Sequence, residues 1–219
     1  MAAGNEYLTV GSIGKGEYTE KKSRFLGEAV RAATLEEAEA YIAAVRKRHY
    51  DARHHCFAFC VGEPGTPDEI WRSSDDGEPS GTAGKPMLEI LKGRELHRTL
   101  LVVTRYFGGT LLGTGGLVRA YSAAAKEAAD SAGIVLVRQG IRLLIGCTYL
   151  ALGRFQYLFA REGITIADTK YGENVTLEVI VPESDAGRVR EMVTRTTDGT
   201  GTCTEAGRMT YEDPGAVDG

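Results

Sequence analysis

The sequence lacks long apolar runs, is poor in cysteine and carries little net charge. None of its uncharged apolar runs approaches the roughly 18 to 20 residues of a membrane-spanning helix, which excludes a membrane protein. The N-terminus has no basic region followed by an apolar stretch, so we expect no secretory signal and a cytoplasmic location. With 42% hydrophobic and 26% charged residues, the 219 residues are typical of a globular protein of one large or two small domains.

The charge balance excludes a protein that coats nucleic acid by bulk attraction. The chain has 26 Lys and Arg against 30 Asp and Glu, a net charge of −4. Residues 1–138 hold 18 charges of each sign, so the whole negative excess lies in residues 139–219. An anionic partner is therefore expected to bind the first part of the chain, through a local patch.

The few cysteines argue against both a disulfide framework and a zinc site. Four cysteines in a cytosolic chain of this size are expected to be free thiols. His54, His55, Cys56 and Cys60 form a cluster, but on a strand the two cysteines lie about 13 Å apart and cannot share one ion. We therefore expect buried thiols, no metal and no cofactor.

Residues 139–219 predict the order strand, helix, strand, strand, helix, strand. Ile141–Cys147 and Val175–Val181 have the pattern of strands, and Leu150–Glu162 has apolar residues at helical spacing. A further helix runs to about Thr196, and Gly201–Ala206 forms the last predicted strand. This order is that of a ferredoxin-like α+β sandwich, with two helices on one face of an antiparallel sheet.

Residues 1–138 have a different pattern and predict a separate α/β domain. Thr34-Leu35-Glu36-Glu37 is a capping box that begins a helix, and Leu100–Tyr106 is typical of a buried strand. An alanine-rich helix is expected from about Gly115 to Ala132, whereas the polar stretch Gly62–Gly81 is expected to be a loop. The change of pattern indicates a domain boundary near Arg138–Gly140.

The loop Ser73–Pro86 concentrates hydroxyls, glycines and the carboxylates Asp75, Asp76 and Glu78. Loops this rich in polar groups often carry function. Its spacing matches neither a P-loop nor an EF-hand, because a proline or an arginine occupies required positions. Two interpretations remain: a surface loop that caps the next helix, and a functional loop that either binds a partner or holds magnesium through its carboxylates.

The segment Arg105–Arg119 leads from a strand through glycines into a helix. A helix start with free N–H groups attracts anions such as phosphate. The match to a dinucleotide fingerprint is poor, because Val118 occupies the last glycine position. The segment therefore predicts either an anion site or tight packing of the helix on the sheet.

Several motifs together resemble one known family. They are Lys21–Phe25, His54–Ala58, Ser74–Pro86, and Thr104–Gly109 with Arg119–Tyr121. The chain resembles the IMPACT family, in its bacterial YigZ-like branch, over its whole length. This resemblance implies an N-terminal α/β domain similar to domain IV of elongation factor G, and a C-terminal ferredoxin-like domain similar to its domain V.

The family resemblance implies a role with RNA or at the ribosome and supplies no established catalytic residue. We therefore expect a non-catalytic, translation-associated regulatory or accessory protein, with RNA, the ribosome or a protein of the translation machinery as partner. The alternatives are a magnesium-dependent enzyme that acts on a phosphate-containing substrate through Asp75, Asp76 and Glu78, and a protein-interaction module. The expected RNA- or anion-binding residues are Lys22, Arg24, Arg53, His54, His55, Ser80, Thr82, Lys85, Arg105, Tyr106, Gly109, Gly113, Gly115, Gly116 and Arg119.

Overall fold

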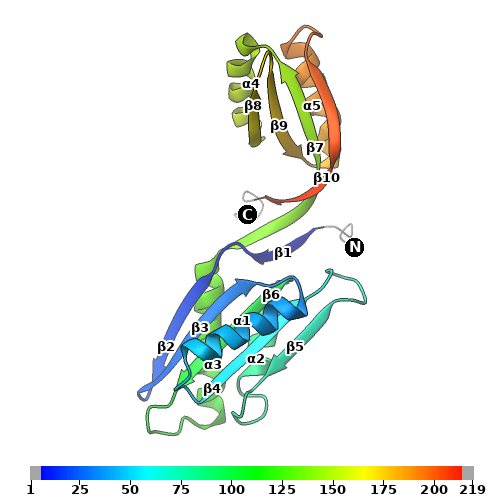
Figure 1. Ribbon diagram of the computed structural model, residues 1–219. Helices are drawn as coiled ribbons and strands as arrows, with labels where there is room; N and C mark the ends of the chain where they lie inside the picture. Colours follow the sequence, from blue (N-terminus) through cyan, green and yellow to red (C-terminus); the bar gives the residue numbers. More distant parts are fainter. Residues whose placement is uncertain (1–5, 214–219) are drawn as a thin grey trace. The chain divides into compact units, whose positions relative to one another are not determined.

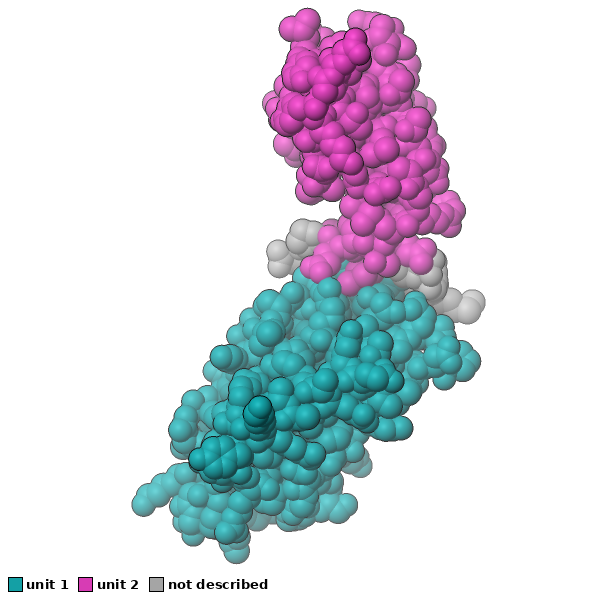
Figure 2. Space-filling model, viewed as in Figure 1, with its two compact units in different colours: residues 1–136, 214–219 teal, residues 137–213 magenta. Residues whose placement is uncertain are grey.

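The computed structural model describes residues 6–213, which form two compact units, residues 6–136 and residues 137–213 (Figures 1 and 2). The first unit contains an antiparallel sheet with the strand order β2-β3-β6-β4-β5. Its elements are β1 (Tyr7–Val10), β2 (Gly14–Glu20), β3 (Ser23–Arg31), α1 (Leu35–Arg48), β4 (His54–Val61), β5 (Ile70–Ser74), α2 (Gly84–Gly93), β6 (Thr99–Tyr106) and α3 (Gly113–Ala132).

Helices cover both faces of this sheet, because its central strands bury side chains on both sides. On β6, Leu100 and Val102 pack in the core beneath α1, whereas Leu101 and Val103 pack in the core beneath α2 and α3. Strand residues alternate between the two faces, so one continuous apolar run supplies both cores. The first unit is therefore a three-layer α/β structure.

The capping box predicted at the start of α1 is confirmed. The Thr34 hydroxyl accepts a hydrogen bond from the Glu37 backbone N–H at 3.3 Å. The Glu37 carboxylate reaches back and accepts from the Ala33 N–H at 2.7 Å. Both bonds satisfy donors that the start of a helix otherwise leaves without partners.

The second unit has the predicted ferredoxin-like order. It contains most of β7 (Ile134–Cys147), together with α4 (Tyr149–Arg161), β8 (Ile166–Tyr171), β9 (Val175–Val181), a 3-10 turn (Glu183–Asp185), α5 (Ala186–Thr196) and β10 (Thr202–Asp213). The sheet order in this unit is β10-β7-β9-β8. Both helices pack on one core, to which α4 contributes Phe155 and Phe159 and α5 contributes Val189 and Val193.

One expectation about an individual element is wrong. The stretch Gly62–Gly81, expected to be a loop, contains β5, an edge strand that pairs with β4 although only Ile70 and Trp71 in it are large and apolar. Backbone pairing to a neighbouring strand holds this segment, and side-chain pattern does not report such pairing. The division into two units falls after Leu136, inside the continuous strand β7 and two residues before the expected boundary near Arg138–Gly140.

The two units have separate hydrophobic cores. We propose on this basis that residues 1–138 and 139–219 are two domains that unfold independently. Among the described residues, no helix is both long enough and apolar enough to cross a membrane.

Candidate nucleic-acid interface

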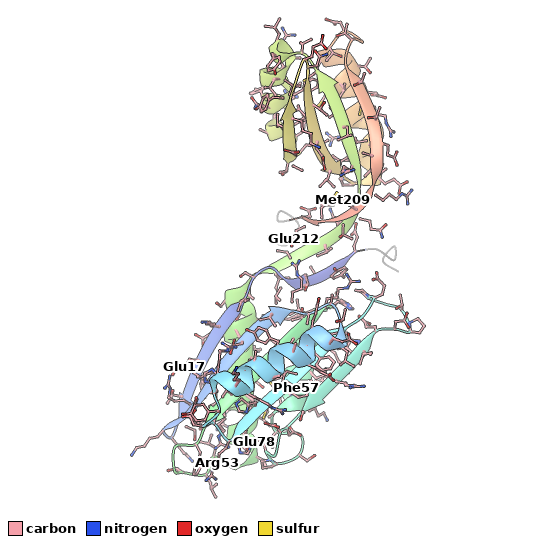
Figure 3. All side chains as sticks on the ribbon, viewed as in Figure 1. Glu17, Arg53, Phe57, Glu78, Met209 and Glu212 are labelled. Carbon is pink, nitrogen blue, oxygen red and sulfur yellow. The ribbon has the colours of Figure 1, made fainter. Side chains whose placement is uncertain are left out.

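The two polar loops of the first unit meet at one end of its sheet. The register of three central strands places Arg105 beside both Phe25 on β3 and His54 on β4, so their loop ends adjoin. A pocket of about 370 Å³ opens there, between the strand ends, the loop before α2 and the start of α3. Figure 3 labels two of its residues, Arg53 and Glu78, at this end of the unit. The pocket is lined by Arg53, His54, Glu78, Pro79, Arg105, Phe107, Leu111, Leu112, Gly113, Thr114 and Leu117.

The floor of this pocket is a buried ion pair. The Arg105 guanidinium donates to the Glu78 carboxylate at 2.6 Å, and both side chains are almost fully buried, with exposed fractions of 6% and 3%. The Tyr121 hydroxyl donates to the same carboxylate oxygen at 2.8 Å. The guanidinium also lies 5.4 and 5.5 Å from the ring centres of Phe25 and Phe107.

Arg105 was expected to contact phosphate, and its burial against Glu78 contradicts a direct surface contact. Because the opposite charges of this pair nearly cancel at such a short distance, the pair attracts an external anion only weakly. Its Nε still lacks a hydrogen-bond partner among the described residues. Arg105 therefore forms part of the pocket floor, and its Nε–H has no acceptor among the described residues.

The start of α3 faces this pocket with free backbone donors. Gly113 and Thr114 line the pocket, and Gly113, Thr114 and Gly115 are exposed. The first turn of α3 has no acidic residue, and no side chain caps it. Gly113 has φ +71° and Gly109 has φ +85°, backbone conformations that favour glycine over other residues. Such a helix start carries partial positive charge and attracts anions.

The three carboxylates of the acidic loop each bind a different protein group. Asp75 accepts from the backbone N–H groups of Gly81, Ala83 and Gly84 at 2.8 to 2.9 Å, which caps α2. Asp76 accepts from the His55 N–H at 2.7 Å and from the Arg46 guanidinium at 2.8 Å.

This arrangement corrects the magnesium alternative. Among residues 6–213, Asp75, Asp76 and Glu78 do not bring their oxygens together as a metal site would require. Protein donors already satisfy each of them. The capping interpretation of the loop therefore fits the structure.

The role of Asp75 predicts a specific dependence of stability on pH. Burial would raise the pKa of Asp75, but the hydrogen bonds from Gly81, Gly84 and Ala83 outweigh it and hold that pKa below its usual 3.8. Because the pKa is lower in the folded state, the stabilisation is complete well above pH 3.8 and is lost as the pH falls from 3.8 through the lower pKa of the folded state.

The change Asp75→Asn tests this role, because an amide keeps the shape and loses the charge. It should lower the free energy of unfolding by about 1.5 to 3 kcal/mol at pH 7, the usual value for a hydrogen bond to a charged group. Urea unfolding at pH 7 and pH 3 measures this, and the difference from wild type should shrink at pH 3. An equal difference at both pH values would contradict the role of the charge.

The expected cationic residues differ in whether they have carboxylate partners. Arg24 pairs with Glu17 at 2.9 Å, and Arg119 lies 3.6 Å from Glu20. Exposed Lys22, Arg53 and Lys85 have no ion-pair partner in the part of the chain that the structure describes. The Lys22 backbone lies directly against Gly108, where a Cβ would be 2.0 Å from the Lys22 carbonyl carbon. The Lys22 turn therefore adjoins the glycine-rich loop.

The expected aromatic and histidine contacts divide between the two faces of the sheet. His54 lines the pocket and bonds through Nδ1 to the Asp76 carbonyl oxygen at 2.8 Å. His55 was expected to stack on a base, but it is 6% exposed and its Nε2 lies 3.1 Å from the His49 carbonyl oxygen. Burial lowers the pKa of His55. His55 therefore has a structural position.

Hydrogen bonds hold the Tyr106 hydroxyl outside the pocket. Its hydroxyl lies 2.9 Å from the His49 ring and donates to Asp51 at 3.2 Å. Within the acidic loop Ser80 is exposed, but Thr82 is buried and donates to the Pro79 carbonyl oxygen at 2.6 Å. Gly116 is also buried, which leaves Gly109, Gly113 and Gly115 as the exposed glycines of the expected set.

Two apolar residues of the site were missed in the sequence. Phe107 and Leu111 line the pocket although their exposed fractions are 42% and 82%. These two side chains form an exposed apolar lip of the pocket beside the start of α3. Their place in a glycine-rich loop rather than a strand is the signal that could have identified them.

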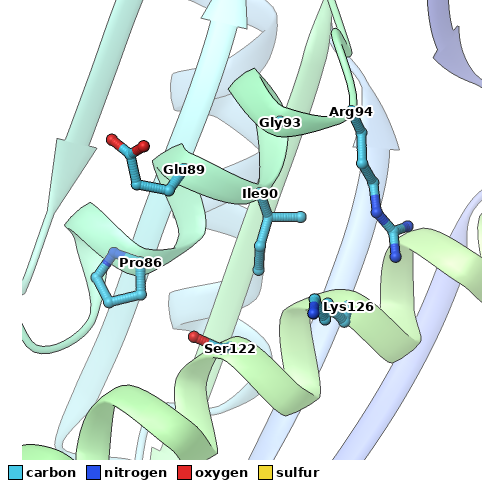
Figure 4. A pocket seen from close by; sticks show the side chains of 7 residues that line it. All are labelled: Pro86, Glu89, Ile90, Gly93, Arg94, Ser122 and Lys126. Carbon is cyan, nitrogen blue, oxygen red and sulfur yellow. The ribbon is translucent and has the colours of Figure 1, made fainter.

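A second pocket contains none of the expected residues. It lies between α2 and α3 and has a volume of about 420 Å³ (Figure 4). Pro86, Ile90, Ser122 and Lys126 are among its lining residues. The pocket at the loop end is therefore the one associated with the sequence motifs.

Comparisons with known proteins agree with these motifs. The Impact N-terminal domain matches residues 21–129, and a domain of unknown function, DUF1949, matches residues 145–200. The IMPACT family member YvyE of Bacillus subtilis is 39% identical over 94% of this chain and 94% of its own length. The IMPACT family member YigZ of Escherichia coli is 38% identical over 81% of this chain and 85% of its own.

Solved structures extend the comparison. A crystal structure described as that of a hypothetical protein shares 33% identity at a TM-score of 0.59, over 91% of this chain and 96% of its own. The two-domain translational regulator Yih1 aligns with 57% of this chain at 25% identity and a TM-score of 0.37, which is too weak for conclusions about this chain. With nearly full-length relatives at 38% and 39% identity, the chain belongs to the IMPACT family.

Proposed function

We propose that this chain is a non-catalytic accessory protein of translation that binds single-stranded RNA, including exposed RNA of the ribosome. The binding surface is the pocket end of the first unit, with the start of α3, Arg53, Phe107 and Leu111 at its centre. The family resemblance supports the link to translation, and the chemistry of the pocket supports RNA as the ligand.

One observation carries the proposal: free backbone donors, an unpaired cation and exposed apolar side chains line the same pocket. The α3 start has neither a capping side chain nor an acidic residue, and Arg53 has no ion-pair partner among the described residues. Backbone N–H groups at a helix start and an arginine are standard ligands of phosphate.

The apolar lip accounts for the choice of RNA over a free anion. Unpaired bases stack on exposed aromatic side chains, and Phe107 offers such a ring beside the phosphate donors. Lys22 extends the same surface, since its turn lies against Gly108. A local patch of this kind binds RNA even though the whole chain has a net charge of −4.

Binding of a labelled single-stranded RNA across a range of salt tests the proposal. Phe107→Ala should weaken binding by about 5- to 150-fold, the equivalent of 1 to 3 kcal/mol for one stacked base. Arg53→Glu should weaken binding and lower the slope of log K against log salt by about 0.7, the value for one phosphate contact on a single strand.

Lys92→Glu is the matched control, because Lys92 is exposed on the last turn of α2 and does not line the pocket. It should leave RNA affinity close to that of the wild type. Equal affinity of all three folded variants would contradict the RNA surface. Co-sedimentation of the same variants with ribosomes asks whether the surface also acts there.

A further inference from the structure

A second group of reactive side chains lies outside the pocket, around Cys60 on β4. The Cys60 Sγ lies 3.2 Å from the Glu69 Oε1 and 3.9 Å from the His97 Nδ1, and these two atoms are 2.5 Å apart. In residues 6–213 this is the only group of three or more histidine, cysteine or acidic side chains that could hold one metal ion.

The sheet register brings the three side chains together. Cys60 pairs with Trp71 on β5 and with Thr99 on β6, its neighbours on either side. Glu69 lies two residues before Trp71, and His97 lies two residues before Thr99. Both side chains therefore extend from the entry points of adjacent strands toward the thiol between them.

We infer that Cys60, Glu69 and His97 form a zinc-binding site, with solvent as the fourth ligand. Thiolate, imidazole and carboxylate together are the donor set of zinc, whereas the thiolate excludes magnesium and calcium. Thiolate and carboxylate also balance the charge of a divalent ion.

The distances fit a tetrahedral ion after one small movement. Zinc bonds of about 2.3 Å to sulfur and about 2.0 to 2.2 Å to nitrogen and oxygen separate the ligand atoms by roughly 3.3 to 3.6 Å. The two distances from Cys60 Sγ, 3.2 and 3.9 Å, lie on either side of this range. Only the His97–Glu69 pair, now joined by a hydrogen bond of 2.5 Å, must open, by roughly 1 Å.

The opening of the His97–Glu69 pair accompanies the loss of ligand protons when zinc binds. His97 binds zinc through the Nδ1 lone pair and keeps one proton on Nε2. If the ring is imidazolium, its Nδ1 proton is released to solvent; if the ring is neutral with its proton on Nδ1, that proton goes to solvent and Nε2 takes one up from solvent. The Cys60 thiol releases its proton to solvent, because a metal-bound thiol is deprotonated. Binding therefore requires no oxidant or other co-reactant.

Neighbouring groups orient the three side chains as outer partners do at metal sites. The Arg98 backbone interacts with the Cys60 sulfur, and the Trp71 side chain interacts with the Glu69 carboxylate. The His97 ring makes edge contacts with Trp71 and Tyr7, with ring centres 5.7 and 6.5 Å apart. Such contacts fix ligand direction and raise metal affinity.

Exposure decreases from the histidine to the cysteine, which leaves one side open for the solvent ligand. The side chains of His97 and Glu69 are 23% and 12% exposed, whereas Cys60 is fully buried. Three protein ligands with one open position are typical of zinc sites that exchange a ligand. This proposal departs from the expectation of no metal and is independent of the proposed RNA surface.

Cobalt(II) titration of the full chain, after treatment with a chelator, tests the site, because cobalt bound to thiolate absorbs light. The wild type should gain a sulfur-to-cobalt charge-transfer band with a stoichiometry of one, and zinc should displace the cobalt. Cys60→Ala should abolish the band. Cys56→Ala is the matched control, since Cys56 is buried on the same strand and belongs to no such group among the residues that the structure describes.

Glu69→Gln and His97→Gln keep the proposal testable if Cys60→Ala fails to fold, because both side chains are partly exposed. Loss of an outer partner of a metal ligand lowers metal affinity by about 10- to 100-fold. Each of these two changes should lower zinc affinity by more than that, whereas Trp71→Phe should lower it by an amount within that range. Zinc should raise the unfolding midpoint of the wild type and leave that of Glu69→Gln unchanged. No cobalt band in the wild type, or the same band in Cys60→Ala, would overturn the site.

Discussion

Removal of the Glu78 carboxylate should destabilise the first unit by about 3 to 5 kcal/mol, the usual cost of breaking a buried ion pair from one side. In Glu78→Ala the Arg105 guanidinium stays buried with no opposite charge, and the Tyr121 hydroxyl loses its acceptor. Arg105 already has one unpaired buried nitrogen among the described residues, so the remaining charge has few alternatives.

Urea unfolding followed by tryptophan fluorescence measures this loss, because the single tryptophan, Trp71, lies in the first unit. Circular dichroism of the same samples reports both units. If the units are independent domains, the fluorescence transition should move to lower urea while a second dichroism transition stays in place. A shift of both transitions together would contradict the two-domain proposal without affecting the ion pair.

Double substitution separates the charge from the packing. Glu78→Ala combined with Arg105→Met should recover part of the lost stability, because the uncompensated charge is gone. Additive losses from the two changes would mean that the pair itself contributes little. A loss below 1 kcal/mol in Glu78→Ala alone would contradict the burial of this pair.

The sequence predicted where the candidate site lies better than what its residues do. The loop around Asp75 and the glycines before α3 were both identified, because glycine, proline and acidic residues in a fixed order are visible in one dimension. No sequence pattern indicates the pairing of Glu78 with Arg105, because the two are 27 residues apart and meet only where the loop before α2 folds against the end of β6. Periodicity reports which face a residue occupies and does not report its partner across the sheet.

The same limit explains the other differences. His54 and His55 are neighbours in the sequence, but strand alternation sends one to the pocket and buries the other on the opposite face. Cys60, Glu69 and His97 escaped notice because their separations, 9 and 28 residues, match no short metal motif. The ferredoxin-like order was predictable because each of its elements carries its own apolar pattern.

A methyl group at Gly27 should destabilise the first unit by about 3 kcal/mol, the upper end of the usual cost of overpacking. A Cβ on Gly27 would lie 2.3 Å from the Ala124 carbonyl oxygen and 2.8 Å from its carbonyl carbon, far inside van der Waals contact. Both atoms belong to the backbone of α3, so rotation of a side chain cannot relieve the clash. Gly27→Ala therefore requires α3 to move away from the sheet, which loosens the alanine-rich core between them.

Two further variants distinguish backbone contact from ordinary crowding. Gly93→Ala is the control, because a Cβ there meets nothing within 4 Å, and it should leave stability nearly unchanged. Adding Ala128→Gly to Gly27→Ala removes only a Cβ at 3.2 Å and should not restore stability. Restoration by Ala128→Gly would show that side-chain crowding, rather than contact with the α3 backbone, makes glycine necessary here. Because α3 places Gly113 and Thr114 at the pocket, the close contact of its backbone with Gly27 also fixes the position of the proposed phosphate donors.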